Sequence, residues 1–215
     1  MTRRLGGWLT LVGVVSAIGF ASRLSGGKPD RDVLYKYATA FEELVLFVVV
    51  FGFVLLIARG LPKREAFALR RPTSWRRAAG IGLVVLVVVL VIGRALDPIL
   101  HASDEQGLAP THWEPRHAAA FGVNFAVFAL VGPIVEELTF RGLGYSLLQS
   151  FGATVAILGV GIAFGLWHGL IEALPILTAF GIGLAYLRAR TASVYPGIVL
   201  HVFFNALALT VAVST

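Results

Sequence analysis

Long apolar stretches with almost no charge recur along the whole 215-residue chain and constrain its fold more than any other feature. Hydrophobic residues make up 57% of the sequence and charged residues 14%, whereas soluble domains contain about 45–50% and about 25%. A helix that crosses a bilayer needs about 20 mostly apolar residues. Seven stretches come close to this pattern: 5–22, 44–58, 78–93, 117–135, 142–171, 173–187 and 191–215. We therefore predict an all-α, polytopic transmembrane helical bundle with seven or eight spans.

The basic residues are distributed unevenly between the predicted loops, and this sets the topology. The segment 59–77 contains seven Lys and Arg residues, whereas 94–116 contains two. Cytoplasmic loops of membrane proteins collect Lys and Arg, so we expect 59–77 to be cytoplasmic and 94–116 to be external. Arg3 and Arg4 then place the N-terminus in the cytoplasm. The loop 23–36 carries four basic residues and falls outside, as an exception to this rule.

The cysteine count, the net charge and the absence of repeats exclude several kinds of site, partner and domain organisation. Because the sequence has no cysteine, disulfides, zinc–thiolate sites and iron–sulfur clusters are excluded. The net charge of +6 follows from the basic cytoplasmic loops, so we expect membrane lipids and no nucleic acid as partners. No internal repeat divides the chain, and we predict a single transmembrane domain over residues 1–215. The stretch 5–22 has the length of a signal peptide, but no small-residue cleavage pattern follows it, which favours a span.

Three polar groups lie inside apolar stretches of the second half of the chain. They are Glu136-Glu137-Leu-Thr-Phe-Arg141, Phe164-Gly-Leu-Trp-His168 and His201-Val-Phe-Phe-Asn205. An ionisable side chain at the centre of a membrane helix costs about 2.5–3.5 kcal/mol on insertion scales. Each group therefore needs a structural or chemical reason to be there.

Helical spacing gives these groups a common geometry. His201 and Asn205 are four residues apart and project from the same helix face. Glu137 and Arg141 have the same spacing and can form an ion pair, while Glu136 points about 100° away from that pair. Alternatively, the two glutamates cap a helix and pair with Arg141 at the membrane interface. Three such groups in one chain favour a functional site over this alternative.

The expected depths of the three groups in the membrane agree. We expect one helix to end near Leu148, the next to begin at Gly152 and the last to begin near Ala192. With a rise of about 1.5 Å per residue, the three groups lie about 14–24 Å from those ends. A polar intramembrane cavity is therefore geometrically possible.

The helix that carries the glutamate pair cannot be one straight span. The stretch 117–148 is too long for that, since about 20 residues cross the bilayer. Kinks in helices have identifiable causes, of which Pro and Gly are the most common. We therefore expect a kink at Gly132–Pro133 or a break near Gly142 and Gly144.

Two further patterns have plain structural interpretations. Glycines recur every four residues at Gly161, Gly165 and Gly169, a pattern that predicts close helix packing. The external segment contains potential metal ligands at His112, Glu114 and His117. Pro115 disfavours the continuous helix that would align these ligands, so we interpret the segment as a polar loop with Trp113 at the membrane interface.

The three polar groups resemble the motifs of a known family. The sequence Val131-Gly-Pro-Ile-Val-Glu136-Glu137-Leu-Thr-Phe-Arg141-Gly142 is similar to the Glu-Glu-x-x-x-Arg motif of the CPBP (CAAX protease and bacteriocin-processing, or Abi) intramembrane proteases. The segments 164–168 and 201–205 resemble the family's Phe-x-x-x-His and His-x-x-x-Asn motifs, in the family's order. The resemblance covers about residues 120–208, the family core.

The resemblance implies a role for each polar residue. Glu136 and His168 would position and deprotonate a water molecule, as a general base does. His201 and Asn205 would face the oxyanion of the tetrahedral intermediate. Glu137 and Arg141, as supporting residues, would hold the first glutamate in place.

The motifs leave open whether the predicted site uses a metal ion. Glu136, His168 and His201 form a carboxylate-plus-two-His set that could bind zinc with an open fourth position. The sequence lacks the His-Glu-x-x-His motif of many zinc proteases, and similar enzymes depend on glutamate. We expect no obligatory metal or other cofactor, with zinc as the alternative.

These observations predict an intramembrane endopeptidase, glutamate-dependent or metal-dependent. Its expected substrate is a peptide or protein presented at the membrane, and its expected location is the cytoplasmic membrane of a prokaryote. Two alternatives remain. One is a non-catalytic scaffold or chaperone on the same fold, and the other is a transporter that uses the polar cluster as a solute or proton path.

Overall fold

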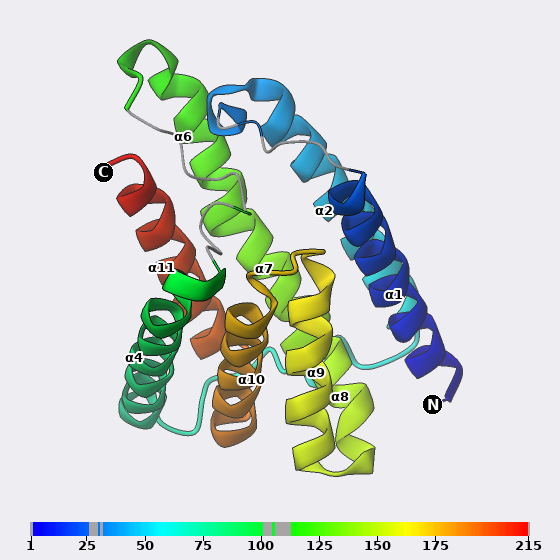
Figure 1. The fold of residues 1–215 in the computed structure, drawn as a ribbon. Helices are drawn as coiled ribbons and strands as arrows, with labels where there is room; N and C mark the ends of the chain where they lie inside the picture. The colour runs from blue at the N-terminus through cyan, green and yellow to red at the C-terminus, as the bar shows by residue number, and fades with distance from the viewer. Residues whose placement is uncertain (1, 26–29, 31, 101–104, 106–112, 215) are drawn as a thin grey trace.

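The computed structural model describes residues 2–25, 30, 32–100, 105 and 113–214, and these ranges contain helices and no strand (Figure 1). The all-α fold predicted from the sequence is confirmed. The longer helices are α1 (Thr2–Leu24), α2 (Tyr37–Ile57), α4 (Trp75–Leu100), α9 (Ala153–Trp167), α10 (Leu174–Thr191) and α11 (Tyr195–Ala212). The shorter helical segments are η1 (Val33–Tyr35), α3 (Lys63–Ala66), η2 (Pro115–His117), α6 (Ala118–Ala126), η3 (Val127–Val131), α7 (Gly132–Glu137), η4 (Leu138–Gly144), α8 (Tyr145–Leu148) and η5 (Gln149–Phe151).

Several helices have the length and composition of membrane spans. In the described part of the chain, 5 helices are long and apolar enough to cross a membrane: 2–24, 37–57, 75–96, 115–151 and 195–212. The apolar helix α9 has 15 residues, and α10 has 18. Together these helices are consistent with the predicted seven or eight spans. Large apolar side chains such as Val48 and Leu83 are exposed on α2 and α4, as expected for a surface that faces lipid.

The helix boundaries near the site largely follow the sequence. The charge-free stretch 142–171 is divided between two helices, because α8 ends at Leu148 and α9 begins at Ala153. Gly152, between them, has a φ of +107°, a conformation that glycine adopts without strain. The last helix begins at Tyr195, three residues after the expected start, because Ala192 takes a left-handed conformation that ends α10.

The helix that carries the glutamate pair contains two wide π-helical turns, where we expected a kink or a break. These turns are η3 and η4, and they lie directly before and after α7. In η3, the backbone N–H of Gly132 donates to the carbonyl of Val127, five residues earlier. Pro133 has no N–H to continue the pattern. The proline therefore produces a wide turn in a continuous helical run from Pro115 to Phe151.

Glycines allow α9 and α10 to pack side by side, as the spacing predicted (Figure 1). A Cβ at Gly161 would lie 2.4 Å from Cγ1 of Ile182, and one at Gly165 would lie 2.2 Å from Oγ1 of Thr178. Gly169 packs in the same way against the backbone of Gly19 in α1. Since no side chain fits at these positions, the glycines set the distances between α9 and its two neighbours.

Replacing Gly161 by Ala should destabilise the protein, because the added methyl group would overlap Ile182. Overpacking a tight interior costs about 1–3 kcal/mol. Reversible unfolding in mixed micelles, followed by circular dichroism, would measure this loss. Gly13→Ala in α1 is the matched control, because a Cβ at Gly13 would have no other atom within 4 Å. Equal stability of the two variants would contradict the packing role of Gly161.

Candidate functional site

Glu136 and Glu137 occupy the end of α7, between the two wide turns, and both are buried. Their exposed fractions are 9% and 0%. Successive residues in a helix point about 100° apart, so the two carboxylates face different neighbours. Glu137 faces inward to Arg141 and α11, whereas Glu136 faces the imidazoles of His168 and His201.

His168 follows directly after the last residue of α9, whereas the sequence placed it inside a helix. The chain reverses at Gly169, whose φ is +61°, and this ends α9 at Trp167. The Nδ1 atom of His168 lies 2.8 Å from the carbonyl oxygen of Phe164. Since a carbonyl only accepts hydrogen bonds, Nδ1 carries the proton and donates it. Its Nε2 atom faces Oε2 of Glu136 at 4.0 Å.

His201 reaches the same glutamate from α11. Its Nδ1 atom lies 3.2 Å from Oε1 of Glu137, and its Nε2 atom lies 3.8 Å from Oε2 of Glu136. The side chain is 3% exposed. It is therefore held between the two carboxylates, with one ring nitrogen directed to each of them.

The two imidazoles converge on one oxygen atom of Glu136. This atom, Oε2, is buried and makes no hydrogen bond within the described structure. The distances of 3.8 and 4.0 Å to the two Nε2 atoms are too long for direct hydrogen bonds. Polar atoms at such a separation are commonly bridged by a water molecule, and a water needs two to four polar partners. Oε2 of Glu136 and the Nε2 atoms of His168 and His201 supply three such partners.

The expected ion pair between Glu137 and Arg141 is present and fully buried. Nη1 of Arg141 donates to Oε1 of Glu137 at 2.7 Å, and both side chains are 0% exposed. Nη2 of Arg141 donates to the carbonyl of Gly181 in α10 at 3.0 Å, and the guanidinium lies over the ring of Phe164 at 4.3 Å. The pair therefore joins α7, α9 and α10 around the site.

Gly197 of α11 makes room for the second oxygen of Glu137. A Cβ at this position would lie 2.4 Å from Oε2 of Glu137. The motif-based interpretation missed this residue, and its place in the first turn of the helix, directly after Pro196, gave no signal for it. Close approach of α11 to α7 depends on it.

Asn205 is engaged with the backbone of the first wide turn. Its Nδ2 atom donates to the carbonyl of Phe128 at 3.0 Å. The Phe128 carbonyl lacks its usual backbone donors. Gly132, four residues later, donates its N–H to Val127 instead, and Pro133, five residues later, has no N–H. Asn205 supplies the missing donor, one helical turn after His201. The structure thus brings Glu136, Glu137, Arg141, His168 and His201 into one contact network, and Asn205 adjoins it through η3.

Three residues of the site carry donor atoms of the kind that bind metals. Glu136, His168 and His201 offer oxygen and nitrogen donors of the kind that zinc takes. However, no three His, Cys, Asp or Glu side chains are arranged to hold a metal ion anywhere in the part of the chain that the structure describes. The mechanism proposed below is written for the side chains of this chain alone, with zinc as the alternative.

Aromatic contacts organise the segment around η2, which the sequence predicts to be external. Trp113 packs edge-on against Phe121 at 5.3 Å and against Tyr35 at 6.5 Å between ring centroids. Glu114 and His117 lie 3.9 Å apart at their closest charged atoms. His112, the third potential ligand of this segment, lies outside the described residues. The aromatic packing agrees with the interpretation as a loop anchored by Trp113.

Glu105 contacts the turn that follows His168, which the sequence did not indicate. Its two carboxylate oxygens accept hydrogen bonds from the backbone N–H groups of Ile171, Glu172 and Ala173 at 2.7, 2.8 and 3.0 Å. Oriented N–H groups at a helix start favour a carboxylate. Glu105 therefore caps α10 from a segment that the sequence assigned only to an external loop.

The chain is similar to one family and one protein whose names describe peptidases. Residues 118–207 match the family described as type II CAAX prenyl endopeptidase Rce1-like. The protein named "Putative membrane peptidase YdiL" of Bacillus subtilis (strain 168) is 26% identical over 196 residues, which cover 84% of this chain and 75% of that protein. No solved structure matches the chain. The family resemblance seen in the three motifs is confirmed over these residues.

Replacing Arg141 by Met should strongly destabilise the protein, because it leaves the Glu137 carboxylate buried without its cation. Removing one partner of a buried ion pair costs about 3–5 kcal/mol. The measurement is unfolding in mixed micelles, as a double-mutant cycle with Glu137→Leu. The double variant should recover part of the loss, since it leaves no unpaired charge at this position. Additive losses would show that the pair does not act as a unit.

Proposed function

We propose that this multi-pass membrane protein, whose residues 118–207 are an Rce1-like domain, is an intramembrane endopeptidase that hydrolyses a peptide bond of a membrane-associated peptide or protein. The observation that carries the proposal is the buried, unpaired Oε2 of Glu136, which two imidazole Nε2 atoms face at 3.8 and 4.0 Å. Three polar atoms that face one another at these distances can together bind one attacking water.

Glu136 is the general base of the proposed reaction. The water lies between its carboxylate and His168, whose Nε2 atom has a free lone pair because Nδ1 donates to Phe164. One water proton passes to Glu136, while the other is held by His168, and the water oxygen attacks the substrate carbonyl carbon. When the C–N bond breaks, Glu136 returns the proton to the leaving nitrogen. The second water proton then passes from the new carboxylic acid to the amine, so the products are a carboxylate and an ammonium group.

His201 and Asn205 are the proposed donors to the oxyanion. Glu137 accepts from Nδ1 of His201, which directs the Nε2 atom of the same ring toward Glu136 and the reacting groups. An amide has two N–H donors, so Asn205 has one for Phe128 and one for the oxyanion.

The basic segments support a cytoplasmic N-terminus. Arg4 donates to the carbonyl of Arg59 at 3.0 Å, and Arg70 donates to the carbonyl of Ala192 at 2.6 Å. These contacts gather the N-terminus, the segment 59–77 and the turn before α11 at one end of the bundle (Figure 1). Since this end collects the Lys and Arg residues, we place it in the cytoplasm of a prokaryotic cell.

Glu136→Gln should abolish hydrolysis, because the amide cannot accept the water proton. The test uses the purified protein in proteoliposomes, mixed with a detergent extract of membranes from the cells that produce it, in water enriched in ¹⁸O. Mass spectrometry of the peptides then detects new C-termini that carry ¹⁸O, which only hydrolysis during the incubation introduces.

Glu42→Gln, an exposed carboxylate of α2, is the matched control and should leave the labelled products unchanged. If the wild type and Glu136→Gln form the labelled products at equal rates, the proposed function is wrong. Solute or proton flux without any labelled product would favour a transporter instead.

Asn205→Ala should lower the rate of hydrolysis by about 10²–10³, the usual effect of losing one oxyanion donor. The same change also leaves the Phe128 carbonyl without its donor. Adding Pro133→Ala restores a backbone N–H near that carbonyl, so the double variant should regain stability without regaining activity. Recovery of both would mean that Asn205 acts only through Phe128.

A further inference from the structure

Trp8 of α1 reaches the scaffold of the site from outside the family domain. The side chain is 0% exposed, and its indole Nε1–H donates to the carbonyl of Thr139 at 3.0 Å. The ring lies against Gly144, where a Cβ would be 2.4 Å from Cζ2 of Trp8. The indole therefore occupies the space that this glycine leaves open.

The carbonyl that Trp8 binds belongs to the wide turn that follows the glutamate pair. This turn, η4, runs from Leu138 to Gly144 and contains Arg141, the cation of Glu137. A π-helical turn is a strained alternative to the α-helix and is uncommon without stabilising contacts. Arg188 of α10 donates to the carbonyl of Arg141 in the same turn at 3.2 Å. Side chains from α1 and α10 thus hold η4 from two sides.

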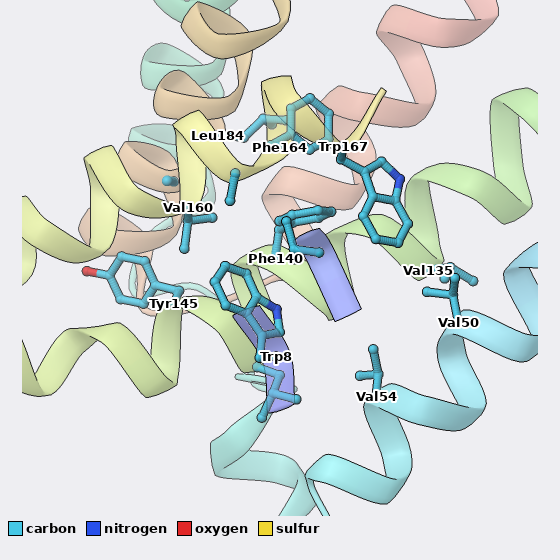
Figure 2. Packing of buried hydrophobic residues seen from close by; sticks show 14 of the residues in the cluster. Trp8, Val50, Val54, Val135, Phe140, Tyr145, Val160, Phe164, Trp167 and Leu184 are labelled. Carbon is cyan, nitrogen blue, oxygen red and sulfur yellow. The ribbon is translucent and has the colours of Figure 1, made fainter. Parts of the chain in front are cut away.

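Trp8, Phe140 and Phe164 lie in one buried cluster (Figure 2), and ring contacts extend from this cluster to both histidines. Trp8 packs edge-on against Phe140, with 6.0 Å between ring centroids, and Phe140 packs edge-on against Phe164 at 5.4 Å. Phe164 contacts the imidazole of His168 at 4.8 Å and that of His201 at 5.6 Å. A displacement of Trp8 would therefore reach the side chains that face Glu136.

The first wide turn has a corresponding contact. There, Asn205 donates a side-chain N–H to the carbonyl of Phe128. Each of the two turns that flank Glu136 and Glu137 is thus bound by at least one side-chain donor from a distant helix. A wide turn rotates the residues on one side of it relative to those on the other side about the helix axis. The turn η3 therefore sets the direction of the glutamates relative to the helix before them, and η4 sets it relative to the helix after them.

We propose that Trp8 is a positioning residue of the proposed peptidase: by donating its indole N–H to Thr139, it fixes η4 and through it the orientation of Glu136. This inference rests on the proposed function. It also assigns a role in the site to α1, which lies outside the matched residues 118–207.

The test removes only the N–H. Nonsense suppression places benzothienylalanine, in which sulfur replaces the indole N–H, at position 8 of the full chain in nanodiscs. The matched control places the same residue at position 167. Trp167 is also buried, at 7% exposure, and also packs edge-on against Phe140 at 5.4 Å. The control thus changes an indole beside the same ring without touching the Thr139 carbonyl.

Two selective labels report on the structure independently of activity. Thr139–Phe140 is the single Thr-Phe pair of the sequence, and Val135–Glu136 is the single Val-Glu pair. Labelling the first residue type with ¹³C at the carbonyl and the second with ¹⁵N therefore gives one NMR peak for each pair. The substitution at position 8 should move both peaks, whereas the substitution at position 167 should leave the Glu136 peak in place.

The same samples are assayed for ¹⁸O-labelled products from the membrane extract. The rate should fall about ten- to a hundredfold for the variant at position 8, as expected when a catalytic group is displaced by a fraction of an ångström to an ångström. An unmoved Glu136 peak, or an equal shift and loss of rate at position 167, would overturn the positioning role. If the wild type forms no labelled product, the proposed peptidase fails, and the Glu136 peak alone then decides whether Trp8 orients this residue.

Discussion

Burial of a carboxylate at membrane depth requires a cation or hydrogen-bond donors for it, and this constraint at Glu137 organises the rest of the site. Glu137 is fully buried, pairs with Arg141 and receives a hydrogen bond from His201. Gly197 permits the close approach of α11 that these contacts need. Four helical segments, α7, η4, α10 and α11, are joined by this one interaction network, since Arg141 also donates to the carbonyl of Gly181.

The two adjacent glutamates have different surroundings, and the proposed division of their tasks rests on this difference. Oε1 of Glu137 is bound by Arg141 and His201, which fixes the position of this carboxylate, while its Oε2 is buried against Gly197. Glu136 points away from the cation and keeps an oxygen without a partner, facing His168 and His201. A residue that must accept a proton during a reaction needs this free oxygen. A paired glutamate next to an unpaired one is therefore a coherent design for water activation inside a membrane.

Much of the fold and part of the site could be predicted from the sequence. The apolar stretches predicted an all-helical membrane protein, and the i, i+4 spacing predicted the pair of Glu137 with Arg141. The expected kink in the long helix took the form of two wide turns instead. Sequence periodicity cannot indicate such turns, because they are stabilised by donors from other helices, Asn205 for η3 and Trp8 for η4. Glu105, which caps α10, was missed for the same reason.

The sequence by itself determined that the chain is helical and apolar, which motifs it carries, and that its few intramembrane charges lie in the second half. These properties are local, because hydrophobicity and helical spacing are read over a few turns. Only the tertiary structure decided that Glu136 faces the two imidazoles while Glu137 faces Arg141, that His168 lies beyond the end of its helix, and that α1 contributes Trp8 to the scaffold. These outcomes depend on contacts between residues up to 131 positions apart, which no local pattern specifies.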